Sequence, residues 1–423
     1  MDQKGKRIVI LGAGFGGTYV LRRLHKHFHG RSGVRITVVN ANNYFLFTPL
    51  LHEVATGNLW PENLVESVRE LFPCCAIDFF LGEVLEIKTA GKSIVTTRGE
   101  VPYDYAVIAL GAETNFYDIP GAREHTFPLK SLEDAIELKN HFIHSFEHAA
   151  QTRDERERAR RLHFVVAGGG PTGVELAAEM AEFFYKTFGK LYDEDLMRAV
   201  KITLIESGNR LLSRFSEPLQ KKALRVLEGK GVAVKFRTNI TRVSEWSAEL
   251  DTGENIETHT VAWTAGVKPH DLKFDISVER DERGRILVDG HLRLKGCDNV
   301  FVLGDMASFT DEKTNAPLPQ LAQVAVKEGV FVADSIARLL DGQIFKPFSY
   351  RRSGDLVSLG TWMAAGEIGM FYIWGHLTWV LWRTVYFSKL LSYRKKVQVG
   401  VDWILNTFAP RDTSELYKRA RGK

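Results

Sequence analysis

Cysteine is scarce in this sequence. The 423 residues include three cysteines, Cys74, Cys75 and Cys297, and the first two are neighbours, a spacing at which a disulfide is strained. A secreted fold held together by disulfides is therefore excluded, and a reducing compartment is indicated. None of the three thiols lies in a pattern that suggests redox chemistry, so we expect all of them to be inert.

Net charge is also small. The 56 Lys and Arg residues nearly balance the 52 Asp and Glu residues, and the resulting charge of +4 argues against a dedicated nucleic-acid-binding protein. The composition, 44% hydrophobic and 26% charged, is that of a globular protein and excludes disordered, collagen-like and polytopic membrane chains. The first strand-like run begins at Arg7, so we expect no signal or transit peptide and a core that stays in a bacterial-type cytosol.

Two segments of the chain have the pattern of a β-α-β unit. In the first, buried strands at Ile8–Leu11 and Val34–Val39 flank a glycine-rich turn and a helix. In the second, the strand His163–Ala167 is followed by GGGPTG, a helix over Val174–Phe188 and the strand Lys201–Ile205. Two such units predict an α/β fold with two Rossmann-like dinucleotide-binding domains, each with a parallel sheet and right-handed crossovers.

The first turn carries a G-x-G-x-x-G fingerprint at Gly12, Gly14 and Gly17. The first glycine permits the tight turn, the second lets the backbone approach a pyrophosphate, and the third lets helix and strand pack closely. Asn40 stands where an acidic residue normally ends the second strand, so the expected ribose contact carries no charge. The residues predicted to bind this dinucleotide are Gly12, Gly14, Phe15, Gly16, Gly17 and Asn40.

The second turn repeats the fingerprint at Gly168, Gly170 and Gly173, and Glu206 ends the strand that follows. A carboxylate there accepts hydrogen bonds from both ribose hydroxyls and repels a 2′-phosphate, which favours NADH over NADPH. Arg210 lies nearby and either accommodates such a phosphate or has a surface or capping role. The residues predicted to bind this dinucleotide are Gly168, Gly170, Pro171, Thr172, Gly173, Glu206 and Gly266.

Two dinucleotide sites in one chain suggest one fixed cofactor and one mobile one, for which hydride transfer between a flavin and a nicotinamide is the obvious use. The pair Gly304-Asp305 ends the strand-like run 299–303, where an Asp either binds the ribityl hydroxyls of a flavin or caps a helix. The small-residue segments 109–112 and 264–266 are either crossovers between domains or simple turns. The predicted cofactor contacts in these segments are Ala112, Gly266, Gly304 and Asp305.

Several longer motifs resemble those of type II NADH:quinone oxidoreductases: GAGFGG, FTPLLHEVATG (47–57), FPLKSLEDAIELKN (127–140), VVAGGGPTGVELAAE (165–179), VFVLGDMA (300–307) and LAQVAVKEG (321–329). The glycine loops occur in many flavoproteins, whereas LLHEVATG and FPLKSLEDA are much more specific, and the likeness runs from Arg7 to about Phe408. This resemblance implies non-covalent FAD in the first domain and NADH as substrate in the second. It further implies hydride transfer to the flavin and delivery of two electrons to a membrane quinone, without proton pumping.

The resemblance also implies roles for two residues. Glu175 matches the family's glutamate near the nicotinamide and flavin, although by itself it is equally a carboxylate favoured by the dipole at a helix N-terminus. Gln323 matches a glutamine at the flavin and quinone pocket, although by itself it suits a helix surface. Lys327 stands where the family often has a second Gln, so the quinone contacts do not carry over in detail.

The predicted domain organisation follows from these assignments. Residues 1–120 and 271–349 form the FAD-binding domain in two parts, and residues 121–270 form the NADH-binding domain. Residues 350–423 form a C-terminal helical, membrane-associating module. The charge run 153–161 is interpreted as a solvated helix face or linker.

Residues 370–391 are long enough to span a bilayer but contain His376, Arg383 and Lys389, which argues against a spanning helix. The residue types favoured at membrane interfaces are present as Tyr372, Trp374, Trp379, Trp382 and Tyr386. Residues 394–423 add eight Lys and Arg against three Asp and Glu, a net +5 that suits an anionic surface. We expect a monotopic anchor over about 370–408, on the cytoplasmic face of the cell membrane. An apolar dimer interface or a cover over the flavin domain is the alternative, and we also expect a homodimer.

Disulfide reductases of this architecture carry two redox cysteines beside the flavin, and the corresponding stretch 43–57 has none. Electrons are therefore expected to leave through a small diffusible acceptor or a protein partner. Two other functions stay open: a flavoprotein reductase for a soluble redox protein, and a redox-sensing flavin-bearing interaction protein. His144, Glu147 and His148 fit an inverted zinc-protease motif. We interpret this match as chance on a solvated helix face and expect no metal.

Overall fold

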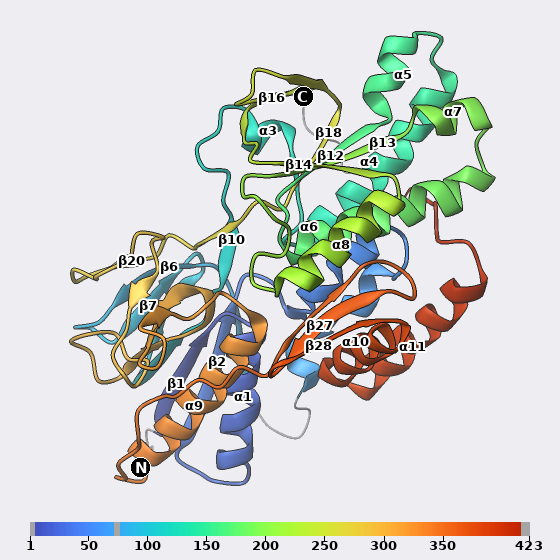
Figure 1. Cartoon of the computed structure of the whole chain (residues 1–423). Coiled ribbons are helices and arrows are strands. Elements are labelled where there is room, and N and C mark those ends of the chain that lie inside the picture. The colour runs from blue at the N-terminus through green and yellow to red at the C-terminus, as the bar shows by residue number, and fades with distance from the viewer. Residues whose placement is uncertain (1–4, 72–76, 416–423) are drawn as a thin grey trace. The chain divides into compact units, whose positions relative to one another are not determined.

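Figure 1 shows the computed structural model, which describes residues 5–71 and 77–415 of the chain. The chain forms two compact units. Unit 1 comprises Met1–Leu46, Val65–Glu113 and Val267–Arg352, and unit 2 comprises Phe47–Leu64, Thr114–Gly266 and Ser353–Lys423. Cys74 and Cys75 lie outside the described residues.

Unit 1 is built on a five-stranded parallel sheet. Its strands lie in the order β22 (Val300–Val302), β9 (Tyr105–Ile108), β1 (Lys6–Leu11), β2 (Val34–Asn40) and β5 (Asp78–Leu81). Successive side chains of a strand point to opposite faces, so Ile8 and Ile10 pack on one side of β1 and Val9 and Leu11 on the other. The first pair contacts helices α1 (Phe15–Phe28) and α9 (Ala322–Leu340). The second pair contacts the sheet of β20 (Lys273–Phe274), β6 (Val84–Lys88), β7 (Ser93–Thr96) and β8 (Gly99–Pro102).

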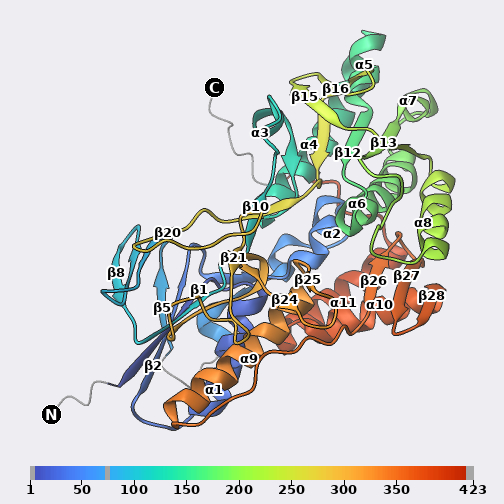
Figure 2. The ribbon, with the colours of Figure 1, turned by 60° about the vertical axis from the view of Figure 1, so that its left-hand side comes forward.

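Helices α1 and α9 lie side by side against this sheet, as both ribbon views show (Figures 1 and 2). Their close approach depends on Gly329, where a Cβ atom would lie 2.7 Å from the carbonyl oxygen of Gly16. Small residues on facing helices therefore allow the backbones to touch, at the first turn of α1 and near the middle of α9.

Unit 2 contains a second five-stranded parallel sheet, in the order β11 (Phe127–Pro128), β18 (Thr260–Trp263), β12 (His163–Ala167), β13 (Lys201–Glu206) and β14 (Val232–Phe236). One face packs against the antiparallel strands β15 (Ile240–Ser244), β16 (Ser247–Leu250) and β17 (Asn255–Glu257). On β12, Phe164 instead joins a ring cluster with Phe142, Phe146 and Phe184. These rings belong to α4 (Leu132–Gln151) and to the helical segment that follows β12.

The helix predicted over Val174–Phe188 differs from the structure at both ends. Helix α6 (Pro171–Glu182) begins at Pro171, whose missing N–H costs nothing at the first helical position. A π-helical turn over Phe183–Thr187 and a 3₁₀ turn over Phe188–Lys190 then continue it. Phe183, Phe184 and Phe188 are all fully buried, and the wider turn lets these closely spaced rings face the core together.

The C-terminal part is not purely helical. Its helices α10 (His376–Lys389) and α11 (Tyr393–Phe408) are preceded by an antiparallel sheet of β26 (Asp355–Ser358), β27 (Ala364–Ile368) and β28 (Phe371–Gly375). No strand was predicted here, because the three strands are only four or five residues long and none has a clear alternation of apolar and polar residues.

For two of the aromatic residues, the prediction that they lie at a membrane interface is wrong. Trp382 is 0% exposed and Trp379 is 8% exposed, so both rings belong to the interior of unit 2. Arg383 lies with them, and its guanidinium stacks 4.7 Å from the ring centroid of Trp379. The charged residue that argued against a spanning helix is therefore itself packed in the interior of the unit.

The remaining α-helices and strands are short, except for α8 with its 13 residues. They are β3 (Tyr44–Leu46), α2 (Leu51–Ala55), β4 (Val65–Ser67), β10 (Ala112–Thr114), α3 (Ala122–His125), α5 (Glu155–Arg161), α7 (Glu194–Ala199), α8 (Glu217–Gly229), β19 (Val267–Pro269), β21 (Ile286–Leu287), β23 (Ala307–Ser308), β24 (Thr310–Asp311) and β25 (Ala316–Pro317). The predicted charge run at 153–161 forms α5, none of whose residues is buried, which agrees with a solvated helix face.

Candidate active site

Three predicted flavin-binding segments converge in unit 1, at the carboxyl ends of β1 and β22. A Cβ atom on Gly16 would lie 3.7 Å from Cβ of Ala325, and one on Gly304 would lie 3.3 Å from the same atom. The glycine loop, the Gly304-Asp305 turn and the first turn of α9, which carries Gln323, therefore meet. The carboxyl edge of a parallel sheet is where nucleotides bind in such folds.

The glycine loop has the geometry of a pyrophosphate cradle. Gly12 has φ +98°, and a Cβ there would lie within contact distance of the Ala109 backbone. A Cβ on Gly17 would overlap the carbonyl oxygen of Gly12, whereas Gly14 has no atom within 4 Å of its Cβ position. Gly14 precedes α1, which has no acidic residue in its first turn. An open, uncharged helix N-terminus fits the phosphates of a dinucleotide.

The turn at Gly304 depends on a residue that the sequence analysis did not single out. Oε2 of Glu328, on α9, accepts the Gly304 N–H at 2.6 Å. Burial raises the pKa of Glu328 to about 8, so this carboxyl is neutral at pH 7 and adds no negative charge beside Asp305. Glu328 belongs to the LAQVAVKEG motif, so the motif itself already pointed to this residue.

The second glycine loop repeats this cradle in unit 2. Gly168 has φ +108°, a Cβ on Gly173 would overlap the Gly168 carbonyl oxygen, and Gly170 has no atom within 4 Å of its Cβ position. Helix α6 also lacks an acidic residue in its first turn. Gly266 belongs to the same edge of the sheet, because a Cβ on Gly168 would lie 2.8 Å from Cα of Ala265. The predicted residues Pro171 and Thr172 form the first turn of α6.

The residues that end the second strands hold their glycine loops in the same way. Oδ1 of Asn40 accepts the Ala13 N–H at 3.0 Å, and Oε2 of Glu206 accepts the Gly169 N–H at 2.7 Å. The second oxygen of Glu206 accepts the Gly208 N–H at 2.6 Å, which fixes the plane of the carboxylate. Asn40 therefore makes the same contact to its glycine loop as the acidic Glu206 makes, but Asn40 carries no negative charge.

The two small-residue segments are crossovers rather than simple turns. The chain leaves unit 1 after Glu113 and returns to it at Val267. Strand β10, which begins at Ala112, pairs there with β19. Of the two interpretations that the sequence left open, crossovers between domains or simple turns, the chain path therefore supports the crossovers.

Glu175 lies on α6 in unit 2 and is 7% exposed. Its Oε1 accepts the Ser358 N–H at 3.0 Å, and its Oε2 lies 3.8 Å from Nδ1 of His52. Burial raises the pKa of Glu175 to about 8, an effect that the Ser358 N–H opposes and the neighbouring Glu53 and Glu179 carboxylates reinforce. Glu175 is thus a buried carboxylic acid that keeps its proton at pH 7, a property typical of proton-transferring groups.

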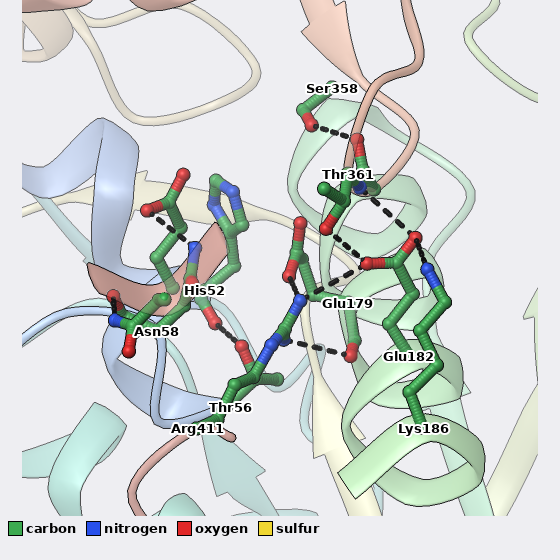
Figure 3. Close-up of polar contacts among 12 residues, drawn as sticks. His52, Thr56, Asn58, Glu179, Glu182, Lys186, Ser358, Thr361 and Arg411 are labelled. Carbon is green, nitrogen blue, oxygen red and sulfur yellow. Dashed lines mark hydrogen bonds and ion pairs between the residues drawn. The ribbon is translucent and has the colours of Figure 1, made fainter. Parts of the chain in front are cut away.

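Glu175, Glu179 and Glu182 occupy one face of α6, at helical spacing, and all three are buried. Figure 3 shows Arg411 reaching between the last two. Its Nη2 lies 2.6 Å from Oε2 of Glu179 and 3.2 Å from Oε2 of Glu182. Burial alone would raise the pKa of Glu182, but Lys230 and Arg411 hold it at about 2.

Glu53, on α2, is the fourth buried carboxylate of this cluster. Its Oε2 accepts hydrogen bonds from Asn58 at 3.0 Å and from Nε1 of Trp403 at 2.8 Å, and it lies 3.3 Å from Nη1 of Arg383. The Arg383 guanidinium in turn stacks 4.1 Å from the Trp403 ring centroid. Each of the other three carboxylates therefore lies beside an arginine, whereas Glu175 lies beside a histidine.

Sequence reasoning found Glu175 but missed its neighbours. The residues missed are His52, Glu53, Glu179, Glu182, Arg383 and Arg411. A usable signal existed in VELAAEMAE, where glutamates recur every three to four residues in an otherwise apolar helix that must be buried.

Other singled-out residues lie away from these sites or are explained locally. Lys327 donates to the Arg351 carbonyl oxygen and stacks 4.9 Å from the Tyr350 ring centroid. Burial raises the pKa of Cys297, which agrees with an inert thiol. Arg210 is exposed. Glu147 accepts a hydrogen bond from Tyr192, and across residues 5–71 and 77–415 no group of His, Cys, Asp or Glu side chains is arranged to hold a metal.

Comparison with known proteins agrees with this architecture. The profile of the pyridine nucleotide-disulphide oxidoreductase family matches residues 6–329, and that of the NDH2 C-terminal domain matches residues 353–412. A type II NADH:quinone oxidoreductase of Staphylococcus haemolyticus (strain JCSC1435) is 32% identical over 375 residues, which cover 88% of this chain and 91% of that protein. The chain belongs to the type II NADH:quinone oxidoreductase family.

Other members of the family extend the match. A probable NADH dehydrogenase of Dictyostelium discoideum is 32% identical over 421 residues, covering 97% of this chain and 91% of that protein. The structure of NDH2 from Plasmodium falciparum in complex with NADH has a TM-score of 0.89 at 21% identity and covers 97% of this chain and 99% of its own. The predicted family, enzyme class and α/β fold class are confirmed.

Proposed function

We propose that this protein oxidises NADH and passes two electrons through FAD to a quinone, without pumping protons. The observation that carries the proposal is the pair of glycine cradles, each open at the second glycine and each at the carboxyl edge of a parallel sheet. FAD, when bound, supplies the ring that accepts a hydride and releases two electrons. The protein supplies binding, orientation and proton transfer.

We assign FAD to the domain predicted over 1–120 and 271–349. Unit 1 covers most of that range, but residues 47–64 and 114–120 belong to unit 2. The residues proposed to hold FAD are Gly12, Gly14, Phe15, Gly16, Gly17, Asn40, Ala112, Gly304, Asp305 and Gln323. Gln323 is also proposed to contact the quinone. The fit rests on the uncharged cradle and on the neutral Glu328 carboxyl, since both keep excess negative charge away from a pyrophosphate.

NADH is assigned to the domain predicted over 121–270. The residues proposed to hold it are Gly168, Gly170, Pro171, Thr172, Gly173, Glu175, Glu206 and Gly266. Both oxygens of Glu206 are already held by backbone N–H groups, so its charge stands at a fixed position beside the ribose. A 2′-phosphate would meet that charge, which favours NADH over NADPH.

The test of the function is the visible spectrum of the purified protein. We expect flavin absorbance that disappears on addition of NADH and returns on addition of a soluble quinone analogue. Flavin absorbance that NADH bleaches no faster than buffer does would contradict the enzyme function. Fast bleaching followed by reoxidation by a soluble redox protein but not by quinone would favour the reductase alternative. A long-lived bleached complex with NAD would favour the redox-sensing alternative.

A membrane-facing surface is proposed for residues about 370–408, within the C-terminal module. No helix within residues 5–71 and 77–415 is long and apolar enough to cross a bilayer. Exposed apolar side chains gather instead on the β27–β28 hairpin and on one face each of α10 and α11: Ile368, Met370, Phe371, Tyr372, Trp374, Leu377, Val380, Val397, Val401, Ile404 and Leu405. A half-exposed apolar face beside basic residues suits a monotopic anchor on an anionic leaflet. We place this anchor on the cytoplasmic face of the cell membrane, and we propose that the enzyme is a homodimer.

Charging the exposed face of α11 is expected to release the protein from membranes. Ile404 and Leu405 lie on the face that Val397 and Val401 share, so I404E/L405E places two carboxylates where apolar area is proposed to enter lipid. We expect at least about a ten-fold loss of binding to vesicles containing anionic lipid, with unchanged oxidation of NADH by a soluble quinone. The matched control is L191E, which charges an exposed apolar residue outside this surface.

The assay is co-sedimentation with vesicles, followed by sizing of the free protein in solution. Full retention of I404E/L405E on vesicles would contradict the anchor. Dissociation of a dimer, with vesicle binding intact, would assign the same surface to the dimer interface.

A further inference from the structure

His52 is a buried histidine that the proposed function has not used. It lies on α2, is 2% exposed, and packs against Trp382 with ring centroids 6.2 Å apart. Its Nδ1 lies 3.8 Å from Oε2 of Glu175. Its Nε2 is buried and has no hydrogen-bond partner among the described residues. Such an orphaned buried polar atom is rare in native proteins, and participation in catalysis is one of its established explanations.

The titratable groups that face His52 come from three parts of unit 2. Glu175 and Glu179 face it from α6, Arg383 from α10, and Arg411 from the segment after α11. Burial lowers the pKa of His52 to about 4, which Glu179 opposes and the two arginines reinforce, so the imidazole is neutral at pH 7. The neighbouring Glu175 carboxyl is protonated at that pH. The two side chains therefore hold one acidic proton at rest, on the carboxyl.

The other carboxylates of the cluster do not offer this chemistry. Glu179 and Glu182 are bound by Arg411, and Glu53 lies 3.3 Å from Arg383, so their charges are already neutralised by guanidinium groups. A guanidinium does not give up its proton in proteins. An imidazole, by contrast, can accept a proton on one ring nitrogen while it donates one from the other. Among these neighbours, His52 is thus the group that is chemically suited to exchange a proton with Glu175.

We propose that His52 returns to Glu175 the proton that Glu175 gives up when quinone is reduced. The inference rests on the proposed function. In the net reaction, NADH, one proton and quinone give NAD⁺ and quinol. NADH is oxidised and quinone is reduced. The hydride supplies two electrons and one of the two hydrogens of the quinol, so the other must come from water as a proton.

The proton steps balance at named atoms. When the O–H bond of Glu175 breaks, a carboxylate forms beside the imidazole, and its negative charge favours the protonated ring. Because Nε2 is closed to solvent and Nδ1 lies 3.8 Å from Oε2, the transfer requires a water molecule buried beside Nε2 and a small side-chain movement that brings Nδ1 within hydrogen-bond reach of Glu175. His52 then takes a proton from this water at Nε2, its Nδ1–H bond breaks, and the O–H bond re-forms on Oε2 of Glu175. The neutral ring then exchanges tautomers with water, which resets the pair. The orphaned Nε2 thereby acquires a function as the entry point of the proton.

The test compares two substitutions of His52 in the full-length FAD-loaded enzyme. H52N keeps a hydrogen-bonding group near the position of Nδ1 but cannot carry a proton, and H52Q does the same near Nε2. H163Q is the matched control, because His163 is also a histidine whose pKa burial lowers to about 4, but its Nε2 is paired with Thr203 on the neighbouring strand. FAD content and the thermal unfolding midpoint report whether each variant folds.

Turnover is measured with a quinone analogue and with ferricyanide, which takes electrons but no protons. For both His52 variants we expect quinone turnover to fall on the order of a hundred-fold at pH 8 and less at pH 6, with a larger solvent deuterium isotope effect and unchanged ferricyanide turnover. Wild-type rates in either variant, or restoration of the wild-type pH profile by H52N, would assign His52 a structural role and overturn the proposal. Equal loss with both acceptors would overturn it as well.

A second readout does not depend on activity. The carbonyl band of the protonated Glu175, identified by its absence in E175Q, is followed by infrared spectroscopy against pH. In the His52 variants we expect the titration midpoint of the Glu175 band to move to higher pH, because the Glu175 anion loses a neighbour that can take up positive charge. An unmoved midpoint would overturn the proposal. If the wild-type enzyme reduces ferricyanide but no quinone, the proposed function fails, and that result is distinct from failure of the His52 variants.

Discussion

Replacing Glu175 with Gln is expected to lower quinone turnover by about a hundred-fold or more while FAD stays bound. Gln keeps the size of the side chain and its acceptor for the Ser358 N–H, but it cannot release a proton. NADH-dependent reduction of ferricyanide, which needs no proton donor, should change much less. The measurement is steady-state turnover with both acceptors, together with flavin content.

The same substitution is expected to stabilise the folded protein at alkaline pH. The pKa of Glu175 rises from 4.5 to about 8 on folding, so between these values the folded state binds a proton that the unfolded state does not. The free energy of unfolding therefore falls as pH rises through this window, by roughly 3–5 kcal/mol in total for a 7% exposed group. Gln removes this loss, and thermal unfolding at pH 6 and pH 8.5 would reveal it.

The control is E194Q, which makes the same chemical change at an exposed residue of α7. It should leave both turnover and the pH dependence of stability unaltered. Unchanged quinone turnover in E175Q would show that the carboxyl is structural, whatever happens to the stability.

Replacing Arg411 with Met is expected to destabilise unit 2 by roughly 3–5 kcal/mol, because it leaves the buried Glu179 carboxylate without its ion-pair partner, whereas Glu182 keeps Lys230. The guanidinium is 8% exposed, contacts both Glu179 and Glu182, and donates to the Glu179 carbonyl oxygen at 3.3 Å. R411K keeps the charge but not the second nitrogen, Nη1, that donates to the Glu179 carbonyl oxygen, so we expect a smaller loss than in R411M. The measurement is the free energy of unfolding by denaturant.

R198M provides the comparison on the surface. Arg198 pairs with Glu194 at 2.7 Å, but both side chains are exposed, so we expect a change below about 1 kcal/mol. Equal effects of R411M and R198M would mean that the Arg411 ion pairs are as well solvated as surface ones. Limited proteolysis adds a second readout, since a loosened segment after α11 should be cut sooner in R411M.

Local sequence patterns predicted best the features whose whole signal lies in one short segment. The strand predicted at His163–Ala167 is β12 without change of bounds, and both glycine loops have the backbone angles that their fingerprints require. Each such feature depends on residues within about a helical turn of one another, so sequence spacing is sufficient to specify it. The position of Glu206 at the end of β13 was likewise predicted from its immediate neighbours in the sequence.

The C-terminal aromatic residues show where this reasoning stops. From composition alone, Trp379, Trp382 and Tyr372 are equally suited to a membrane interface. In the structure, the two tryptophans are buried around Arg383 whereas Tyr372 is exposed. Which face of α10 meets the rest of unit 2 depends on contacts with residues more than three hundred positions away, such as Glu53. No local periodicity encodes such a partner.

The amino-acid sequence by itself determined that this is an α/β protein with two dinucleotide cradles, because those features follow from short-range sterics and hydrogen bonding. Tertiary structure alone decided the ionisation of the candidate active site. Glu53, Glu175, Arg383 and Arg411 come from distant parts of the chain, and the raised pKa of Glu175 depends on its burial and on the distances to its charged neighbours. Both quantities exist only once the chain has folded.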